Sequence, residues 1–362
     1  MQDVIRQVLH YKKPTLWIII AMAAVLVILA VCFLASSTKK YQIRVTIPAG
    51  STEPVCCSDE EISPKGNTLT FYAGEGLEDT EITLLPTEVR EENVLKKIVI
   101  TFIECICFFL GWAILSAVLP LSNSDNPAVW RLWAEITPLL SIIAFTFLFW
   151  ILEKKTIKLH LFNNPIKGVL TGMITGILWL GFPVVIMKLM KAIGFSGKND
   201  IPLFFVWILA AFLNVIMQEL LVRGWLYQAL KQKYNIAIST IVTTALFTLL
   251  HGGAFEAGVV PVVNVLTMSL LMTVILEYSG SLIAPTIMHF IWNGIGALVL
   301  GGVSLADDYP HLLNMTFSGS NLLSGGECKI EGSIVVLAVN VILLAVFIGL
   351  QRKNRNDIAD HA

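Results

Sequence analysis

The chain has 362 residues, of which 56% are hydrophobic and only 14% are charged, and its mean hydropathy is +0.75. Soluble domains carry about 25% charged residues, so most of this chain is expected to lie in a lipid bilayer. The net charge of −1, without a long basic run, excludes nucleic acid as a partner. The cysteines form no Cys-x-x-Cys pair, so neither a zinc ribbon nor a thioredoxin-like site is indicated.

The first apolar segment, Thr15 to Ser36, is typical of an uncleaved membrane anchor because no small-residue cleavage site follows it. After it, three stretches within Tyr41 to Glu92 alternate polar and apolar residues with a period of two, and glycines and prolines separate them. This pattern predicts β-strands and turns. We therefore expect a small β-rich extramembrane insert that docks or binds and carries out no chemistry of its own.

Further apolar segments follow, each near or above the roughly 20 residues that cross a bilayer. With the anchor they give about nine candidate spans by this length criterion. The expected fold class is an all-α polytopic membrane protein with about 8–9 transmembrane helices and a small β-rich extramembrane insert. The later segments run Ile98 to Leu121, Val129 to Leu152, Gly168 to Met190, Leu203 to Tyr227, Ile236 to His251, Val259 to Leu276, Leu282 to Val303 and Ser333 to Leu350.

The sequence predicts four parts. Residues 1–40 form an N-terminal tail and transmembrane anchor, and residues 41–95 form the β-rich insert. Residues 96–352 form the polytopic helical core, with the polar motifs described below inside 203–303, and residues 353–362 form a C-terminal tail.

Basic residues gather on one side of the membrane if each core segment crosses once. The positive-inside rule makes that side cytosolic. The rule leaves open on which side residues 41–95 lie. The basic residues near the amino terminus are compatible with an amino terminus outside and a cytosolic insert, and also with a cytosolic amino terminus and an insert outside. The basic residues of the core are Lys154, Lys155, Lys158, Lys167, Arg223, Lys231, Lys233, Arg352, Lys353 and Arg355.

Gly168, Gly172 and Gly176 recur at a spacing of four residues in one of these segments. Small residues at this spacing let two membrane helices approach closely. We expect this stripe to be a packing surface.

Three apolar segments contain polar or ionisable residues, which are costly in lipid and mark functional sites by default. Glu219 and Arg223 lie four residues apart, on one face of a helix, with Gln218 beside them. His251 ends the next segment, and His289 and Asn293 share a face of a later one. Taken singly, each has a structural explanation, such as an ion pair near a helix end or a hydrogen-bonded core histidine.

The depths of these residues favour a common site. If the turns near Lys231 to Asn235 and Tyr278 to Ser281 lie on one face of the membrane, the rise of about 1.5 Å per residue puts all three groups at overlapping depths, roughly 10 to 25 Å in. A carboxylate, imidazoles and amides that meet in lipid suit metal binding or water activation better than packing.

Three motifs on successive helices resemble those of the CPBP (CAAX protease and bacteriocin-processing, Abi-type) family of intramembrane metalloproteases. They are Gln218-Glu219-Leu-Leu-Val-Arg223, Phe247-x-x-x-His251 and His289-x-x-x-Asn293. The resemblance covers Gly168 to about Val303. It implies that Gln218, Glu219, Arg223, His251, His289 and Asn293 form the catalytic site. His251 would hold the water, and His289 and Asn293 would stabilise the oxyanion. The implied metal ligands are His251, His289 and Asn293, with zinc as the candidate divalent metal.

Gln218 departs from the family pattern, which has a glutamate at this position. An amide orients water but accepts no proton at neutral pH, so the expected general base is missing. A catalytically silent family member that acts as a membrane scaffold is therefore the alternative to an endopeptidase. A small transporter is a third reading, which the lack of an inverted repeat disfavours.

The resemblance implies a membrane protein or peptide as substrate. We expect an integral membrane protein of a bacterial plasma membrane, in contact with the lipid bilayer and with no nucleic-acid partner.

Overall fold

The computed structural model describes residues 94–121, 124–304 and 308–360, with side chains as far as Lys353. The predicted anchor and β-rich insert lie outside these residues. The chain divides into two compact units, residues 26–104 and residues 1–25 with 105–362. The helix α3 (Val94–Val118) begins in the first unit and continues into the second. The other described elements lie in the second unit and are α4 (Pro127–Leu152), α5 (Pro165–Leu189), β1 (Ile193–Lys198), α6 (Phe204–Arg223), α7 (Trp225–Lys233), α8 (Ile236–Leu250), α9 (Gly253–Ala257), α10 (Val259–Ser279), α11 (Ile283–Phe290), η1 (Ile291–Val299), β2 (Leu313–Phe317), α12 (Asn321–Ser324), η2 (Gly326–Gly332) and α13 (Ile334–Asp360).

Within the described residues, six helices are long and apolar enough to cross a membrane: α3 from Leu95, α4, α5, α6 with α7, α10, and η2 with α13 as far as Lys353. All eight later segments of the sequence prediction fall on described helices, but the count of 8–9 spans is not confirmed. The run α8 and the run α11 with η1 are apolar but short. At about 1.5 Å per residue, the 15 residues of α8 cover less than the roughly 30 Å of a bilayer core.

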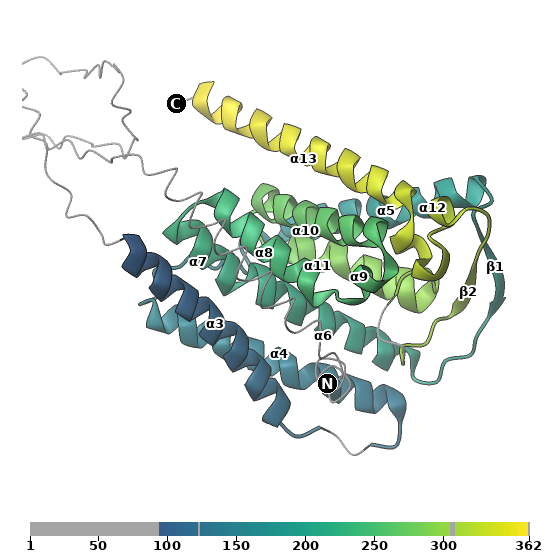
Figure 1. Cartoon of the computed structure of the whole chain (residues 1–362), viewed down its shortest axis with the longest axis horizontal. Helices are drawn as coiled ribbons and strands as arrows, with labels where there is room; N and C mark the ends of the chain where they lie inside the picture. Colours follow the sequence, from purple (N-terminus) through teal and green to yellow (C-terminus); the bar gives the residue numbers. More distant parts are fainter. Residues whose placement is uncertain (1–93, 122–123, 305–307, 361–362) are drawn as a thin grey trace, which may run out of the picture. The chain divides into compact units, whose positions relative to one another are not determined.

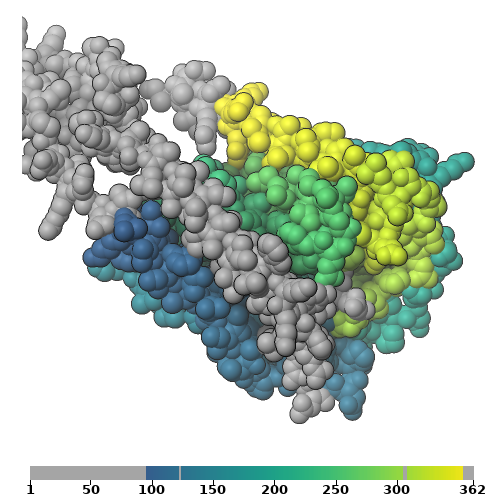
Figure 2. Space-filling model, in the orientation of Figure 1, coloured from purple at the N-terminus to yellow at the C-terminus, as the bar shows by residue number. Residues whose placement is uncertain are grey.

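The helices that carry the motifs are neighbours. α6 packs against α4, α8 and α11, and α10 packs against α8 and α11 (Figure 1). α13 lies along α10, and Figure 2 shows its yellow surface beside the green surface of the α8–α10 region. The polar residues of α6, α8, α11 and η1 are therefore inside a bundle and not on one lipid-facing helix.

The glycine stripe of α5 packs as predicted. A Cβ atom on Gly172 would lie 2.6 Å from the carbonyl oxygen of Ala284, and one on Gly176 would lie 2.7 Å from Ile291 Cδ1. Any larger residue would push α5 away from α11 and η1. This close approach fixes the helix that carries His289.

Gly224 breaks the longest span between α6 and α7. A Cβ atom at this position would lie 2.3 Å from the carbonyl oxygen of Leu220, so only glycine fits the turn. The break comes directly after Arg223 and lets the chain turn while Arg223 stays buried.

One end of the bundle collects the basic residues, as the charge pattern indicates. Lys231 pairs with Glu277 at 2.7 Å and Lys233 with Glu153 at 2.5 Å, which joins the turns after α4, α7 and α10. Arg223 was wrongly counted with this group. It is fully buried, because Glu219 and polar groups of α10 bind its guanidinium.

The β-structure of the described part lies in β1 and β2, which pair antiparallel with Ile193 opposite Phe317. Both strands lie between the predicted membrane segments, where the sequence analysis assigned no element. Each has six residues or fewer, which is too short for the alternation of polar and apolar residues to stand out.

Candidate active site

Glu219 and Arg223 form a buried ion pair on α6. Arg223 Nη1 donates to both carboxylate oxygens of Glu219, at 3.0 and 2.9 Å. Both side chains are 0% exposed. The pairing that the i, i+4 spacing predicts is therefore present, and it is shielded from solvent on every side.

Arg223 also binds α10 and contacts α8. Its Nη2 donates to the carbonyl oxygen and to the hydroxyl of Ser269, both at 2.9 Å. Its Nε donates to the Thr273 hydroxyl at 3.3 Å, and its Cζ lies 5.2 Å from the centre of the Phe247 ring. One guanidinium thus connects three helices, and all its hydrogen-bonding nitrogens are engaged.

His289 binds the same carboxylate. Its Nδ1 lies 2.8 Å from Glu219 Oε1, and since a carboxylate only accepts hydrogen bonds, Nδ1 carries the proton. The Nε2 atom is then the acceptor of the ring, and Asn293 Nδ2 donates to it at 3.3 Å. Glu219, His289 and Asn293 form a continuous chain, and their exposed fractions are 0%, 2% and 6%.

The helix changes form between His289 and Asn293. α11 ends at Phe290, and Asn293 lies in η1, a π-helical segment of nine residues. π-helical turns are rare and often occur at functional sites. Asn293 follows His289 by four residues, and its amide lies against the His289 ring across this change of helix type.

His251 follows the last residue of α8, and the Phe247 ring lies close to both the His251 and the His289 rings. The Nδ1 atom of His251 donates to the Phe247 carbonyl oxygen at 2.7 Å, which leaves the lone pair on Nε2. The Phe247 ring centre lies 4.2 Å from the centre of the His251 ring and 6.0 Å from that of His289. The motif phenylalanine therefore contacts both imidazoles and the Arg223 guanidinium.

Gln218 points to a different network. Its Nε2 donates to Asn214 Oδ1 at 2.6 Å, and Asn214 Nδ2 donates to Glu135 Oε2 at 2.8 Å. Because the Glu135 carboxylate only accepts, it sets the direction of both bonds. Within the part of the chain that the structure describes, Gln218 Oε1 is a buried acceptor without a hydrogen-bond partner.

Sequence reasoning missed Glu135 and Asn214. Glu135 is 4% exposed on α4, and it accepts from Arg131 Nη1 at 3.3 Å and from the Tyr309 hydroxyl at 3.2 Å. Burial raises the pKa of Tyr309, which keeps its hydroxyl protonated as a donor. The available signal was an ionisable residue inside the apolar segment Val129 to Leu152.

The residues expected to bind a metal do not fit a zinc site. Catalytic zinc normally has three protein ligands, drawn from histidine, cysteine and carboxylate side chains. The described part of the chain contains no cluster of at least three such residues placed to hold an ion. Asn293 turns its amide nitrogen, which is a donor, toward His289, and Glu219 is bound by Arg223.

Comparisons with known proteins agree with the motifs. Residues 200–295, from before α6 into η1, match the family model described as Type II CAAX prenyl endopeptidase, Rce1-like. The resemblance to the CPBP family is confirmed for this segment, which contains all six candidate residues. The match makes this segment similar to the membrane endopeptidases that the family model describes. Searches of curated proteins and of solved structures gave no match.

Proposed function

Because the segment with the motifs resembles CAAX-type endopeptidases, we propose that the chain hydrolyses a peptide bond of a membrane-associated substrate. The observation that carries this proposal is the buried chain of Glu219, His289 and Asn293. A carboxylate that holds one nitrogen of an imidazole leaves the other nitrogen basic, as in hydrolases that activate a nucleophile with histidine.

His289 acts as the general base. A water molecule that replaces the Asn293 amide as the donor to Nε2 gives up a proton while the water oxygen attacks the carbon of the scissile carbonyl. Glu219 stabilises the imidazolium that forms. When the C–N bond breaks, the same proton passes from Nε2 to the leaving nitrogen, and the products are a carboxylic acid and an amine.

His251 orients the water through Nε2, the ring nitrogen that its bond to the Phe247 carbonyl leaves as an acceptor. His251 is a weaker candidate for the base, because its Nδ1 faces a backbone carbonyl and the Arg223 guanidinium lies over the adjacent Phe247 ring. The Asn293 amide can donate its second N–H to the oxyanion of the tetrahedral intermediate.

A catalytically silent scaffold is the second candidate, and Gln218 is the observation that favours it. The two functions are separated by incubating the purified full chain in lipid nanodiscs with a panel of farnesylated peptides ending in a CAAX sequence and of single-span membrane peptides. Mass spectrometry detects cleavage, and co-purification detects binding. The proposal expects cleavage of at least one peptide, whereas a scaffold binds without cleaving.

Gln218→Glu tests the role of the Asn214 and Glu135 network. The family pattern suggests that a glutamate here restores a base, but the new carboxylate would face Asn214 Oδ1, with Glu135 as a second buried anion nearby. We expect the single variant to lose about 1 to 3 kcal/mol of stability, the cost of an unsatisfied buried polar group. Adding Glu135→Gln should recover most of this loss and raise the cleavage rate above wild type.

Unfolding in a detergent titration and cleavage rates measured on the same preparations give both quantities. If Gln218→Glu alone is as stable as wild type, Asn214 and Glu135 do not constrain position 218.

A further inference from the structure

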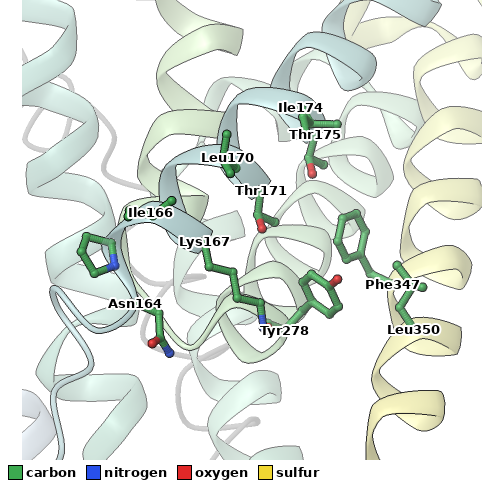
Figure 3. A pocket seen from close by; sticks show the side chains of 11 residues that line it. Asn164, Ile166, Lys167, Leu170, Thr171, Ile174, Thr175, Tyr278, Phe347 and Leu350 are labelled. Atoms are coloured by element: carbon green, nitrogen blue, oxygen red, sulfur yellow. The ribbon is translucent and has the colours of Figure 1, made fainter.

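A cavity separate from the candidate active site lies between α5, the end of α10 and α13. Its volume is about 720 Å³, within the roughly 300 to 1,000 Å³ of small-molecule sites. No candidate catalytic residue lines it (Figure 3). The residues around it are Asn164, Pro165, Ile166, Lys167, Leu170, Thr171, Ile174, Thr175, Tyr278, Phe347 and Leu350.

The α5 wall of the cavity continues onto a surface that faces lipid. Ile166, Leu170 and Ile174 follow one another at four-residue spacing and are 76%, 56% and 58% exposed. α5 is one of the candidate spans, so acyl chains of the bilayer reach this row directly. A chain that enters the cavity exchanges lipid contacts for equally apolar protein contacts, and apolarity alone gives no selectivity.

Selectivity comes from the polar end of the cavity, where Lys167 is fixed. Lys167 Nζ donates to the Tyr278 carbonyl oxygen at 2.7 Å and lies 4.7 Å from the centre of the Tyr278 ring. Figure 3 shows the side chain reaching from α5 toward Tyr278. An ammonium has three N–H donors, so two remain for a ligand.

The charge at this end is positive. Arg352 and Lys353 are exposed and follow Leu350, which lines the cavity, on α13. Within the described residues, Lys167 forms no ion pair with a carboxylate. The first turn of α5, which has no side-chain cap, adds backbone N–H groups beside Asn164. These groups complement a phosphate at the membrane surface.

We propose that this cavity binds an anionic phospholipid of the bilayer. One acyl chain lies between α5 and α13, and the phosphate receives hydrogen bonds from Lys167. Basic pockets between transmembrane helices bind anionic head groups in this way, and each lysine or arginine near the surface strengthens binding by about fivefold.

Native mass spectrometry of the full chain tests this site without a proteolysis assay. The protein is titrated with phosphatidylglycerol and with phosphatidylcholine of identical chains. We expect phosphatidylglycerol to bind at least about fivefold more tightly, and Lys167→Ala to remove about fivefold of that preference. The matched control is Lys188→Ala, since Lys188 is exposed near the other end of α5 and also lies over an aromatic ring, that of Phe195.

A second pair of variants tests the acyl-chain part. Thr171→Trp fills the cavity and should abolish retention of both lipids, whereas Ile177→Trp, at an exposed position of α5 outside the cavity, should not. Equal affinity for the two lipids, equal effects of Lys167→Ala and Lys188→Ala, or full binding by Thr171→Trp would each overturn the proposal. Displacement of the lipid by soluble glycerol phosphate would also overturn it, because the site would then bind a free anion.

Discussion

Replacing His289 with alanine is expected to lower the rate of peptide-bond cleavage by about 10²- to 10⁴-fold, the usual contribution of a general base. The alanine removes the Nε2 lone pair that accepts the proton from water. Glu219 keeps its bond to Arg223, so the ion pair that joins the helices remains. The measurement is a single-turnover cleavage rate at saturating protein, which separates the chemical step from substrate binding.

His160→Ala is the control for this variant. His160 lies in the loop between α4 and α5, and within the described residues the hydrogen bond of its side chain is to the exposed Asn163 amide. Its substitution should leave the cleavage rate unchanged. If His289→Ala cleaves as fast as wild type and His251→Ala does not, the base is His251 and the role given to the Glu219 carboxylate is wrong.

Glu219→Ala is expected to lower the free energy of unfolding by about 3 to 5 kcal/mol, because it leaves the buried Arg223 charge without its partner. The same change removes the acceptor for His289 Nδ1. His289→Ala should cost less, since it breaks two hydrogen bonds and leaves the ion pair intact. Reversible unfolding of the two variants in a detergent titration provides the comparison.

A double variant distinguishes the effect of removing the two charges from the effect of removing side-chain volume. Glu219→Leu with Arg223→Met replaces the pair by apolar side chains of similar size, and such replacements are often neutral or stabilising. The double variant should therefore be more stable than Glu219→Ala. Equal and small losses in all variants would mean that Glu219 and Arg223 are not paired in the folded protein.

Much of the helical core could be predicted from residue patterns, because lipid requires long apolar helices and makes each buried charge conspicuous. The spacing of Glu219 and Arg223 predicts their ion pair, and the glycine stripe of α5 predicts its close packing against another helix. The overlapping depths of His289 and Glu219 predict a common site, and the two side chains are in direct contact.

The remaining features depend on tertiary contacts. In the sequence, Arg223 looks like one of the basic residues at the membrane surface. Its burial is explained by the hydrogen bonds to Ser269 and Thr273 on α10. Gln218 lies beside Glu219 in the sequence, yet its side chain binds Asn214 and, through it, Glu135 on another helix. No local pattern shows that neighbouring residues of a motif belong to different networks.

The central claim is that this chain uses water to cleave a peptide bond, and its most direct test is cleavage in water enriched in ¹⁸O. Purified wild-type protein in nanodiscs is incubated with the peptide panel, and each new carboxyl terminus is examined by mass spectrometry. The account predicts cleavage with one ¹⁸O atom in the new carboxylate, and loss of labelled product in His289→Ala. Binding of a panel peptide by wild type and by Gln218→Glu with Glu135→Gln, without labelled product from either, would contradict it.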